Sequence, residues 1–328
     1  MFVLTQAETE ALLEPDALRQ AMALAMADVS GGRASMPPRI AAGVPAVGGS
    51  LLAMPAYLES SGGLAAKLVT VFPQNEEAGQ PTHQGVVVVF DPRTGTAEAL
   101  LDGTSITAAR TAACSALSVE LLARADSGVL TIIGTGVQAR AHAVAVTRVR
   151  PFHTLRVVGR RIDRARAIAV ELAEELALSP EALDDIDAAC ADSDVICATT
   201  HAAVPVVRGA VLPPGVHVTS VGYNTAGREV DSRAVARSLV VVESRDAALA
   251  PPPAGAHDLR IPIDEGVIGP EHIHAEIGEL VLGTRIGRTS PEQLTLYKSV
   301  GVAAQDVAAA TLVVRMALQR GIGREIPL

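Results

Sequence analysis

The feature that most constrains the fold is a glycine-rich turn that follows a short apolar run near the middle of the chain. The run extends from Val129 to Ile133, and a helical pattern follows at 139–149. Between them lie Gly134, Thr135, Gly136, Val137, Gln138 and Ala139. In this G-x-G-x-x-A form of the dinucleotide fingerprint, the first glycine permits a tight turn, the second lets the backbone approach a pyrophosphate, and the small alanine lets the helix pack on the strand. We expect these six residues to bind a dinucleotide; the alternative is a glycine turn without a ligand.

Strand and helix patterns alternate after this turn. Apolar strand patterns occur at 155–158, 194–200, 216–221 and 239–243, and a helical pattern occurs at 163–176. Such alternation predicts a doubly wound parallel sheet with helices on both faces. The composition agrees, because 49% of the 328 residues are apolar and only 19% are charged, so most elements must be covered on more than one side. We therefore predict an α/β fold with a Rossmann domain over residues 113–302.

The chain before this domain has a different pattern. A helical spacing at 5–29 is followed by strand patterns at 49–54, 65–72, 84–91 and 97–102, and then by a helical pattern at 106–124. The last two strand patterns flank a turn, Asp91 to Gly95, which predicts a hairpin. Residues 1–112 are therefore expected to form an antiparallel α+β unit.

The choice of cofactor is made at the end of the second Rossmann strand, where an acid binds the ribose 2′-hydroxyl and a basic residue receives a 2′-phosphate. Arg160 and Arg161 stand at that place, and the first acid is Asp163. Because arginine pairs with phosphate through two hydrogen bonds, the sequence predicts NADPH. NADH is the alternative if both arginines are merely solvated in a loop.

Two later strand ends supply candidates for the other half of the cofactor site. Thr199 and Thr200 end one strand pattern, and Val221 and Gly222 end the next. Open α/β sheets bind ligands at the carboxyl ends of their strands. We expect these four residues to line the nicotinamide or ribose side of the crevice.

Charge and aromatic content argue against nucleic acid as a partner. The formal net charge is −9, aromatic residues make up 2% and Trp is absent, so neither a phosphate-neutralising face nor a base-stacking platform is available. The start of the chain lacks a basic cluster before an apolar core, and the longest uncharged stretch, 40–58, is interrupted by glycines and prolines. We expect no membrane span and a cytoplasmic location.

The cysteines and histidines form no metal-site pattern. Cys114, Cys190 and Cys197 include no C-x-x-C pair, which excludes a disulfide framework and a thiolate zinc site and indicates a reducing compartment. The segment 271–279 carries two histidines and several acids at a spacing typical of solvent exposure. Glu229 is likewise expected to start a helix or to lie on the surface. We therefore expect no metal.

Several separated motifs together resemble one protein family. They are Lys67 followed by F-P-Q-N at 72–75, P-T-H-Q-G at 81–85, D-G-T-S-I-T-A-A-R-T-A-A at 102–113, G-T-G-V-Q-A at 134–139, V-G-Y-N-T-A-G-R-E at 221–229 and G-R-T-S-P-E-Q-L-T-L-Y-K-S-V-G at 287–301. They span nearly the whole chain, and in this order they resemble the ornithine cyclodeaminase/mu-crystallin family.

The resemblance implies a domain arrangement and a reaction. A split substrate-binding and dimerisation domain, here residues 1–112 together with about 303–328, would surround the Rossmann domain. The resemblance also implies a homodimer joined through the sheets of the split domains. Members of the family move a hydride between a nicotinamide and the alpha carbon of an amino or imino acid, so we expect a small imino or amino acid as the substrate.

Candidate substrate residues follow from the same resemblance. Arg39, Lys67 and Arg110 match the family positions that hold the substrate carboxylate, for which bidentate arginine has suitable geometry. His83 and Gln84 resemble a pair beside the substrate in mu-crystallin, and His83 is a candidate for exchanging a proton with the imine nitrogen. Lys67, Arg110 and His83 are thus the candidate catalytic residues. The alternatives are a surface-loop role for Arg39 and a structural role for His83.

Asn224 distinguishes among the family's reactions. Ornithine cyclodeaminases carry an aspartate at this position and a glutamate shortly before the Met-Pro that here is Met54-Pro55, where this chain has only leucine and alanine. A neutral asparagine cannot pair with a distal ammonium, which a preformed cyclic ketimine lacks. We therefore expect Asn224 to contact the substrate of an NADPH-dependent reductase of cyclic ketimines of the Δ1-pyrroline-2-carboxylate type. The alternatives are an ornithine or lysine cyclodeaminase, an alanine-type dehydrogenase and, as the weakest, a small-ligand binding protein.

Overall fold

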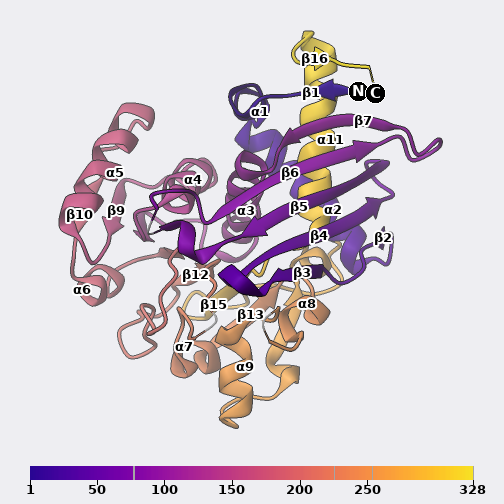
Figure 1. The fold of residues 1–328 in the computed structure, drawn as a ribbon. Helices are drawn as coiled ribbons and strands as arrows, with labels where there is room; N and C mark the ends of the chain where they lie inside the picture. Colours follow the sequence, from indigo (N-terminus) through magenta and orange to yellow (C-terminus); the bar gives the residue numbers. More distant parts are fainter. Residues whose placement is uncertain (77, 225, 253, 328) are drawn as a thin grey trace. The chain divides into compact units, whose positions relative to one another are not determined.

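The computed structural model describes residues 1–76, 78–224, 226–252 and 254–327. The chain divides into two compact units, a split unit of Met1–Arg110 with Val302–Leu328 and a central unit of Thr111–Gly301. Helix α3 (Gly103–Leu122) continues from the split unit into the central unit. Figure 1 shows the chain coloured along its sequence.

The split unit is built on an eight-stranded sheet of order β16-β1-β7-β6-β5-β4-β2, with β3 also paired to β4. Its strands are β1 (Phe2–Val3), β2 (Ala34–Ser35), β3 (Ile40–Val44), β4 (Gly49–Leu58), β5 (Gly63–Val71), β6 (His83–Phe90), β7 (Ala97–Asp102) and β16 (Arg324–Glu325). Strands β1 and β7 are parallel, whereas β3 to β7 pair as an antiparallel meander. Its helical segments are α1 (Gln6–Leu12), α2 (Pro15–Ser30), the 3₁₀ turns η1 (Pro45–Val47) and η2 (Pro73–Glu76), and α11 (Ala303–Arg320).

The single helix expected over 5–29 is wrong, because the structure has two helices there. Helix α1 ends at Leu12, and α2 begins at Pro15. The Glu14 side chain accepts hydrogen bonds from the first backbone N–H groups of α2, and proline at the first helical position suits a helix start. A capping acid followed by proline thus starts a new helix within the apolar periodicity.

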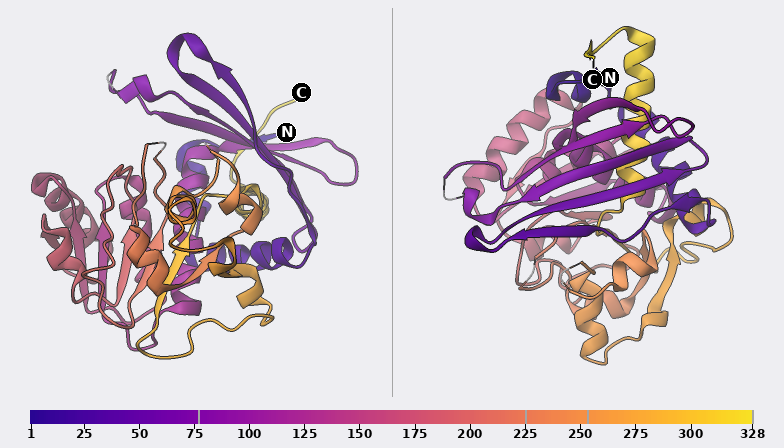
Figure 2. Two further views of the ribbon diagram at one scale, coloured as in Figure 1. Left: turned by 90° about the horizontal axis from the view of Figure 1, so that it is seen from below. Right: turned by 45° about the vertical axis from the view of Figure 1, so that its right-hand side comes forward.

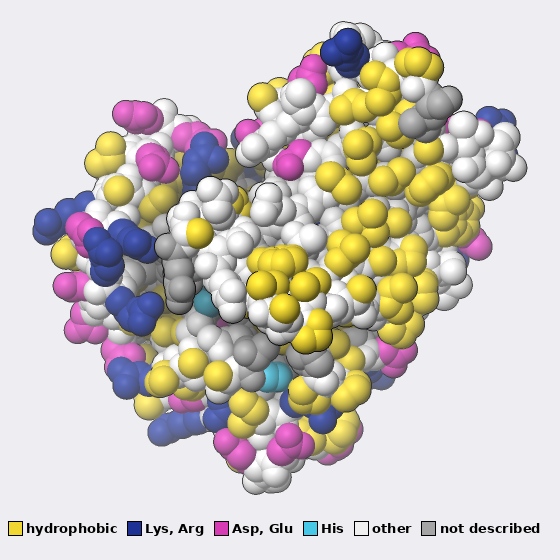
Figure 3. Space-filling model, viewed as in Figure 1, with side chains coloured by type: hydrophobic (Ala, Val, Ile, Leu, Met, Phe, Trp, Pro, Cys, Tyr) yellow, Lys and Arg dark blue, Asp and Glu magenta, His cyan; other side chains and the backbone are white. Residues whose placement is uncertain are grey.

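The two faces of the split sheet differ. Helix α11 lies along one face (Figure 2) and contacts β4, β5 and β6 there. Lys67 and its cross-strand partner Val87 are on this covered face and are buried. The neighbouring cross-strand pair, Leu68 and Val86, points to the opposite face of the sheet, and these residues are 36% and 38% exposed. Figure 3 shows hydrophobic side chains gathered over this second face, which is an apolar surface of the kind that binds another molecule.

The central unit contains an eight-stranded sheet of order β10-β9-β8-β11-β12-β15-β13-β14, in which every pair is parallel. Its strands are β8 (Val129–Ile133), β9 (Thr154–Val158), β10 (Glu181–Leu183), β11 (Val195–Ala198), β12 (His217–Ser220), β13 (Ser238–Val242), β14 (Ile273–Glu276) and β15 (Leu294–Lys298). Its helical segments after α3 are α4 (Val137–Val146), α5 (Ile162–Glu175), α6 (Ile186–Cys190), α7 (Ser232–Arg237), α8 (Arg245–Leu249), α9 (His257–Asp264), the 3₁₀ turn η3 (Pro270–His272) and α10 (Ile277–Val281). The predicted Rossmann fold class is confirmed.

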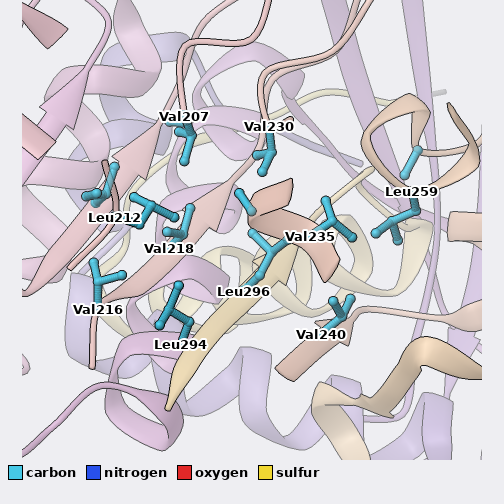
Figure 4. Close-up of a cluster of buried hydrophobic side chains, with 14 of the residues drawn as sticks. Val207, Leu212, Val216, Val218, Val230, Val235, Val240, Leu259, Leu294 and Leu296 are labelled. Atoms are coloured by element: carbon cyan, nitrogen blue, oxygen red, sulfur yellow. The ribbon is translucent and has the colours of Figure 1, made fainter. Parts of the chain in front are cut away.

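The parallel sheet is buried on both faces. One apolar cluster includes Val119 of α3, Leu130 of β8 and Leu172 of α5. A second cluster surrounds Val218 of β12 and Leu296 of β15 (Figure 4). Burial on both faces explains the continuous apolar runs of these strands, and it gives the loops at their carboxyl ends a rigid support.

A helical membrane span requires a long apolar helix, and a metal site requires several ligand side chains that lie close together. No helix in the described ranges is long and apolar enough to cross a membrane. Among those same residues, no group of three or more His, Cys, Asp or Glu side chains is arranged to hold a metal ion. Within the described ranges, the three cysteines are buried and form no disulfide.

Candidate functional site

The glycine-rich turn connects β8 to α4 in the central unit. Gly134 has a φ of 129°, a backbone conformation that side chains with a Cβ rarely adopt. Gly136 precedes the first turn of α4 without a side-chain cap, and a Cβ built on it meets nothing within 4 Å. Ala139 is fully buried. The N-terminus of α4 is therefore open, as the binding of a pyrophosphate on backbone N–H groups requires.

This turn lies where the strand order of the sheet reverses. Strand β8 pairs with β9 on one side and with β11 on the other. The Thr199 hydroxyl, just after β11, donates to the carbonyl oxygen of Ile133 at 2.9 Å, which fastens the end of β11 to the start of the turn. Such a switch point is where open α/β sheets bind dinucleotides.

The two arginines expected to read the cofactor follow the end of β9. The N–H of Gly134 donates to the carbonyl oxygen of Val158 at 2.8 Å, so the arginine loop and the glycine-rich turn start from neighbouring strand ends. Arg160 is exposed. Arg161 is exposed as well and pairs with Asp163 at 2.6 Å. The acid nearest in sequence is thus engaged by one of the arginines.

Asn224 lies in the loop after β12. Its side-chain Nδ2 donates to the carbonyl oxygen of His201 at 2.6 Å, and its Oδ1 accepts from the N–H of Ala226 at 2.8 Å. The side chain therefore links two loops that follow adjacent strands. Among the described residues, this hydrogen bond uses one of the two N–H groups of the amide.

The expectation that Glu229 lies at the surface or starts a helix is wrong. Glu229 is only 2% exposed. Its carboxylate accepts hydrogen bonds from Thr200, Ser220 and Gly222. A charged side chain is buried here because four donors replace its water.

The second cluster of interest lies within the split unit, around Lys67 of β5. The Nζ of Lys67 lies 2.8 Å from Oδ2 of Asp306. The Nε of Arg110 in α3 donates to Oδ1 of Asp306 at 3.0 Å, and its Nη1 donates to Oε1 of Gln305 at 2.6 Å. All four side chains belong to buried residues. The expected substrate residues Lys67 and Arg110 are thus brought together by a single carboxylate.

Burial and neighbouring charges shift the pKa values in this cluster. Burial lowers the pKa of Lys67 to about 8, with Asp306 opposing that change and with Arg110 and Arg39 adding to it. Burial alone would raise the pKa of Asp306, but the charges of Lys67 and Arg110 outweigh it and hold that pKa below its usual range. Arg39, just before β3, is therefore close enough to act on Lys67 electrostatically. Two cations thus contact the Asp306 carboxylate, and a third acts on Lys67 from nearby.

Sequence reasoning missed Gln305 and Asp306. They stand in the first turn of α11, within A-A-Q-D-V-A-A-A, and both are fully buried. A lone acid in an otherwise apolar helix is the signal that could have revealed them, because such a charge is stable only beside a partner. The partners themselves are distant in sequence.

The structure does not bring His83 and Gln84 to this cluster. Lys67 pairs with Val87, so His83 lies four residues further along β6 on the same face, roughly 13 Å away at the usual strand rise. Gln84 lies on the opposite face, with Val86. Both residues are exposed. Within this chain the Gln84 side chain therefore faces away from Lys67, and its contact with a substrate stays a prediction.

The chain matches known proteins over its whole length. The family model described as the ornithine cyclodeaminase/mu-crystallin family matches residues 1–321. A Δ1-pyrroline-2-carboxylate reductase of Bacillus cereus is 35% identical over 328 residues, 99% of each chain. The structure of Thermococcus litoralis Δ1-pyrroline-2-carboxylate reductase in complex with NADH and L-proline is similar with a TM-score of 0.94, at 36% identity over 99% of this chain and 100% of that one. An archaeal alanine dehydrogenase dimer with bound NAD is similar with a TM-score of 0.91, at 31% identity over 100% of this chain and 99% of that one.

Proposed function

We propose, because this chain belongs to the ornithine cyclodeaminase/mu-crystallin family, that it is a nicotinamide-dependent reductase of cyclic ketimines of the Δ1-pyrroline-2-carboxylate type, with an L-amino acid as product. Full-length similarity to two reductases named for this substrate supports the choice. The observation that carries it is the buried cluster in which Lys67 and Arg110 contact Asp306 and Arg39 acts electrostatically on Lys67. The α-carboxylate of an imino acid would pair with these cations.

The roles that we assign follow from this geometry. Arg110 and Arg39 would hold the substrate carboxylate, and Gln305 with Asp306 would keep Arg110 in place. When bound on the glycine-rich turn, the cofactor supplies the hydride for the alpha carbon. Lys67, with a pKa of about 8, would bind the carboxylate as a cation and supply the proton that the imine nitrogen gains. We prefer Lys67 to His83 for this step because His83 lies roughly 13 Å along the sheet from the cluster.

For the cofactor we propose NADPH in preference to NADH. Arg160 and Arg161 follow β9, where a 2′-phosphate would be received, and the acid that follows them in the sequence, Asp163, is paired with Arg161. NADH, which the Thermococcus litoralis enzyme holds in its complex, is the competing choice.

We propose a homodimer joined through the exposed face of the split sheet. Leu68 and Val86 lie opposite each other on this face, and the similar archaeal alanine dehydrogenase is a dimer. Changing both to aspartate should give monomers, because like charges would then be buried in the dimer interface. Light scattering measures the molecular mass. A double variant that remains dimeric would place the interface elsewhere.

The test of function is a comparison of substrates with the purified protein. We expect oxidation of NADPH with Δ1-pyrroline-2-carboxylate and little release of ammonia from ornithine with NAD. Asn224 lacks the charge that a distal ammonium needs, and an unpaired ammonium in a desolvated site costs several kcal/mol. Ornithine turnover comparable to imine reduction would instead indicate a cyclodeaminase, and faster turnover of alanine an alanine-type dehydrogenase.

A further inference from the structure

A buried polar network lies beneath the carboxyl ends of β11, β12 and β15 in the central unit. The Glu229 carboxylate accepts from the N–H and hydroxyl of Thr200 at 2.5 and 2.7 Å. It also accepts from the Ser220 hydroxyl and from the N–H of Gly222, both at 2.8 Å. One side chain therefore holds the backbone at two adjacent strand ends.

Lys298 and Asp258 hold the segment that carries this carboxylate. Lys298 Nζ donates to Ser220 Oγ at 3.0 Å and to the Gly222 carbonyl oxygen at 2.7 Å, and it pairs with Asp258 at 2.7 Å. Asp258 accepts from the N–H groups of Glu229 and Val230 at 2.9 and 2.8 Å. Hydrogen bonds thus hold both Gly222 and Glu229 in place.

The packing around Gly222 leaves no room for a side chain at this position. A Cβ on Gly222 would lie 2.2 Å from both Glu229 Cδ and the Thr200 carbonyl oxygen. Glu229, Lys298 and Asp258 are all buried, so their charges are costly unless each hydrogen bond is made. These ionic groups bond to Thr200 and Gly222, the residues that follow two neighbouring strands, and so they fix the backbone there.

We propose that Glu229 is a positioning residue for the nicotinamide half of the cofactor, acting through the backbone of Thr200 and Gly222. This inference rests on the proposed function, because it takes these two strand ends to face the nicotinamide. The adenine half would be bound from the glycine-rich turn and the Arg160 loop, to which Glu229 makes no hydrogen bond in the part of the chain that the structure describes. A change at Glu229 should therefore weaken binding of the nicotinamide half and leave binding of the adenine half unchanged.

The test compares NADPH with 2′-phospho-ADP-ribose, which lacks the nicotinamide. In Glu229→Gln the side chain keeps its size, but an NH₂ group replaces one acceptor and faces an N–H or hydroxyl donor. We expect the Kd of NADPH to rise by about tenfold or more, since hydrogen bonds to a charged group are lost, while the Kd of 2′-phospho-ADP-ribose changes by less than about twofold. NADH with ADP-ribose provides the second pair. Glu171→Gln, an exposed change on α5, is the control and should alter none of these values.

A milder variant covers the case in which Glu229→Gln does not fold. Ser220→Ala removes one donor to Glu229 and one contact of Lys298, and it should raise the Kd of NADPH by about threefold in the same selective way. Equal weakening of both ligands, or no change in either variant, would overturn the positioning role. A wild-type protein that binds neither NADPH nor NADH would instead overturn the proposed function.

Discussion

Lys67 and Asp306 lie 2.8 Å apart in the split unit, one in the middle of β5 and the other in the first turn of α11. Asp306 also receives Arg110, so one buried carboxylate positions both cations. When one member of a buried ion pair is removed, the other is left as an unpaired charge in a nonpolar surrounding, which lowers the stability of the fold. The pair therefore joins the N-terminal and C-terminal segments of the split unit at the place where we expect the substrate to bind.

Asp306→Asn should destabilise the protein and lower the pKa of Lys67 further. The variant leaves two buried cations beside each other, which typically costs about 3 kcal/mol or more in the free energy of unfolding. Urea unfolding measures that loss. Glu98→Gln removes an exposed acid from β7 in the same unit and should leave stability within about 0.5 kcal/mol of the wild type. Equal stability of the two variants would mean that Asp306 contributes nothing through its charge.

Lys67→Ala and Arg110→Ala should each lower kcat/KM for the imine about a hundredfold or more, equivalent to about 2.7 kcal/mol of transition-state stabilisation. The cause is loss of carboxylate orientation, so the affinity for NADPH should stay nearly unchanged. Steady-state kinetics and a separate cofactor titration distinguish the two effects. Arg93→Ala, which removes an arginine that is 86% exposed in the same unit, is the matched control. Normal imine turnover in either test variant would remove that residue from the site.

The activity should fall as the pH rises through about 8. Burial lowers the pKa of Lys67 to about 8, and only the protonated form can pair with a carboxylate or release a proton. The protonated fraction is nearly complete below pH 7 and is lost above pH 8, so the decline lies on the alkaline side. The variant Lys67→Arg keeps its charge at high pH, so the decline in activity should begin at a higher pH, even if the maximal rate is lower. If the activity of this variant declines at the same pH as that of the wild type, the titrating group is the substrate or another residue.

Replacing Arg160 and Arg161 together with alanine should remove the preference for NADPH. In the wild type we expect NADPH to bind at least tenfold more tightly than NADH, roughly 1.4 kcal/mol, because arginine pairs with the 2′-phosphate. Fluorescence titration with both cofactors gives the ratio. Arg166→Ala changes an exposed arginine of α5 and should preserve the ratio. Tighter binding of NADH by the wild type would contradict the role assigned to these arginines.

Local features of the chain could be predicted because their causes are local. Strands β7 and β8 have the bounds expected from their patterns, Ala97–Asp102 and Val129–Ile133. The turn from Gly134 to Ala139 connects a strand to a helix as expected, since the required conformations are properties of neighbouring residues. Periodicity and turn chemistry act over a few residues, so one sequence is enough to reveal them.

The tertiary structure alone decided how distant segments combine. Strand β15 was not expected, and it lies between β12 and β13, although both precede it in the chain. Asp306 and Glu229 carry no local sign of the partners that bury them. Whether an acid is solvated or is enclosed by donors depends on segments brought together by packing, and that long-range pairing determined both the cluster around Lys67 and the network around Glu229.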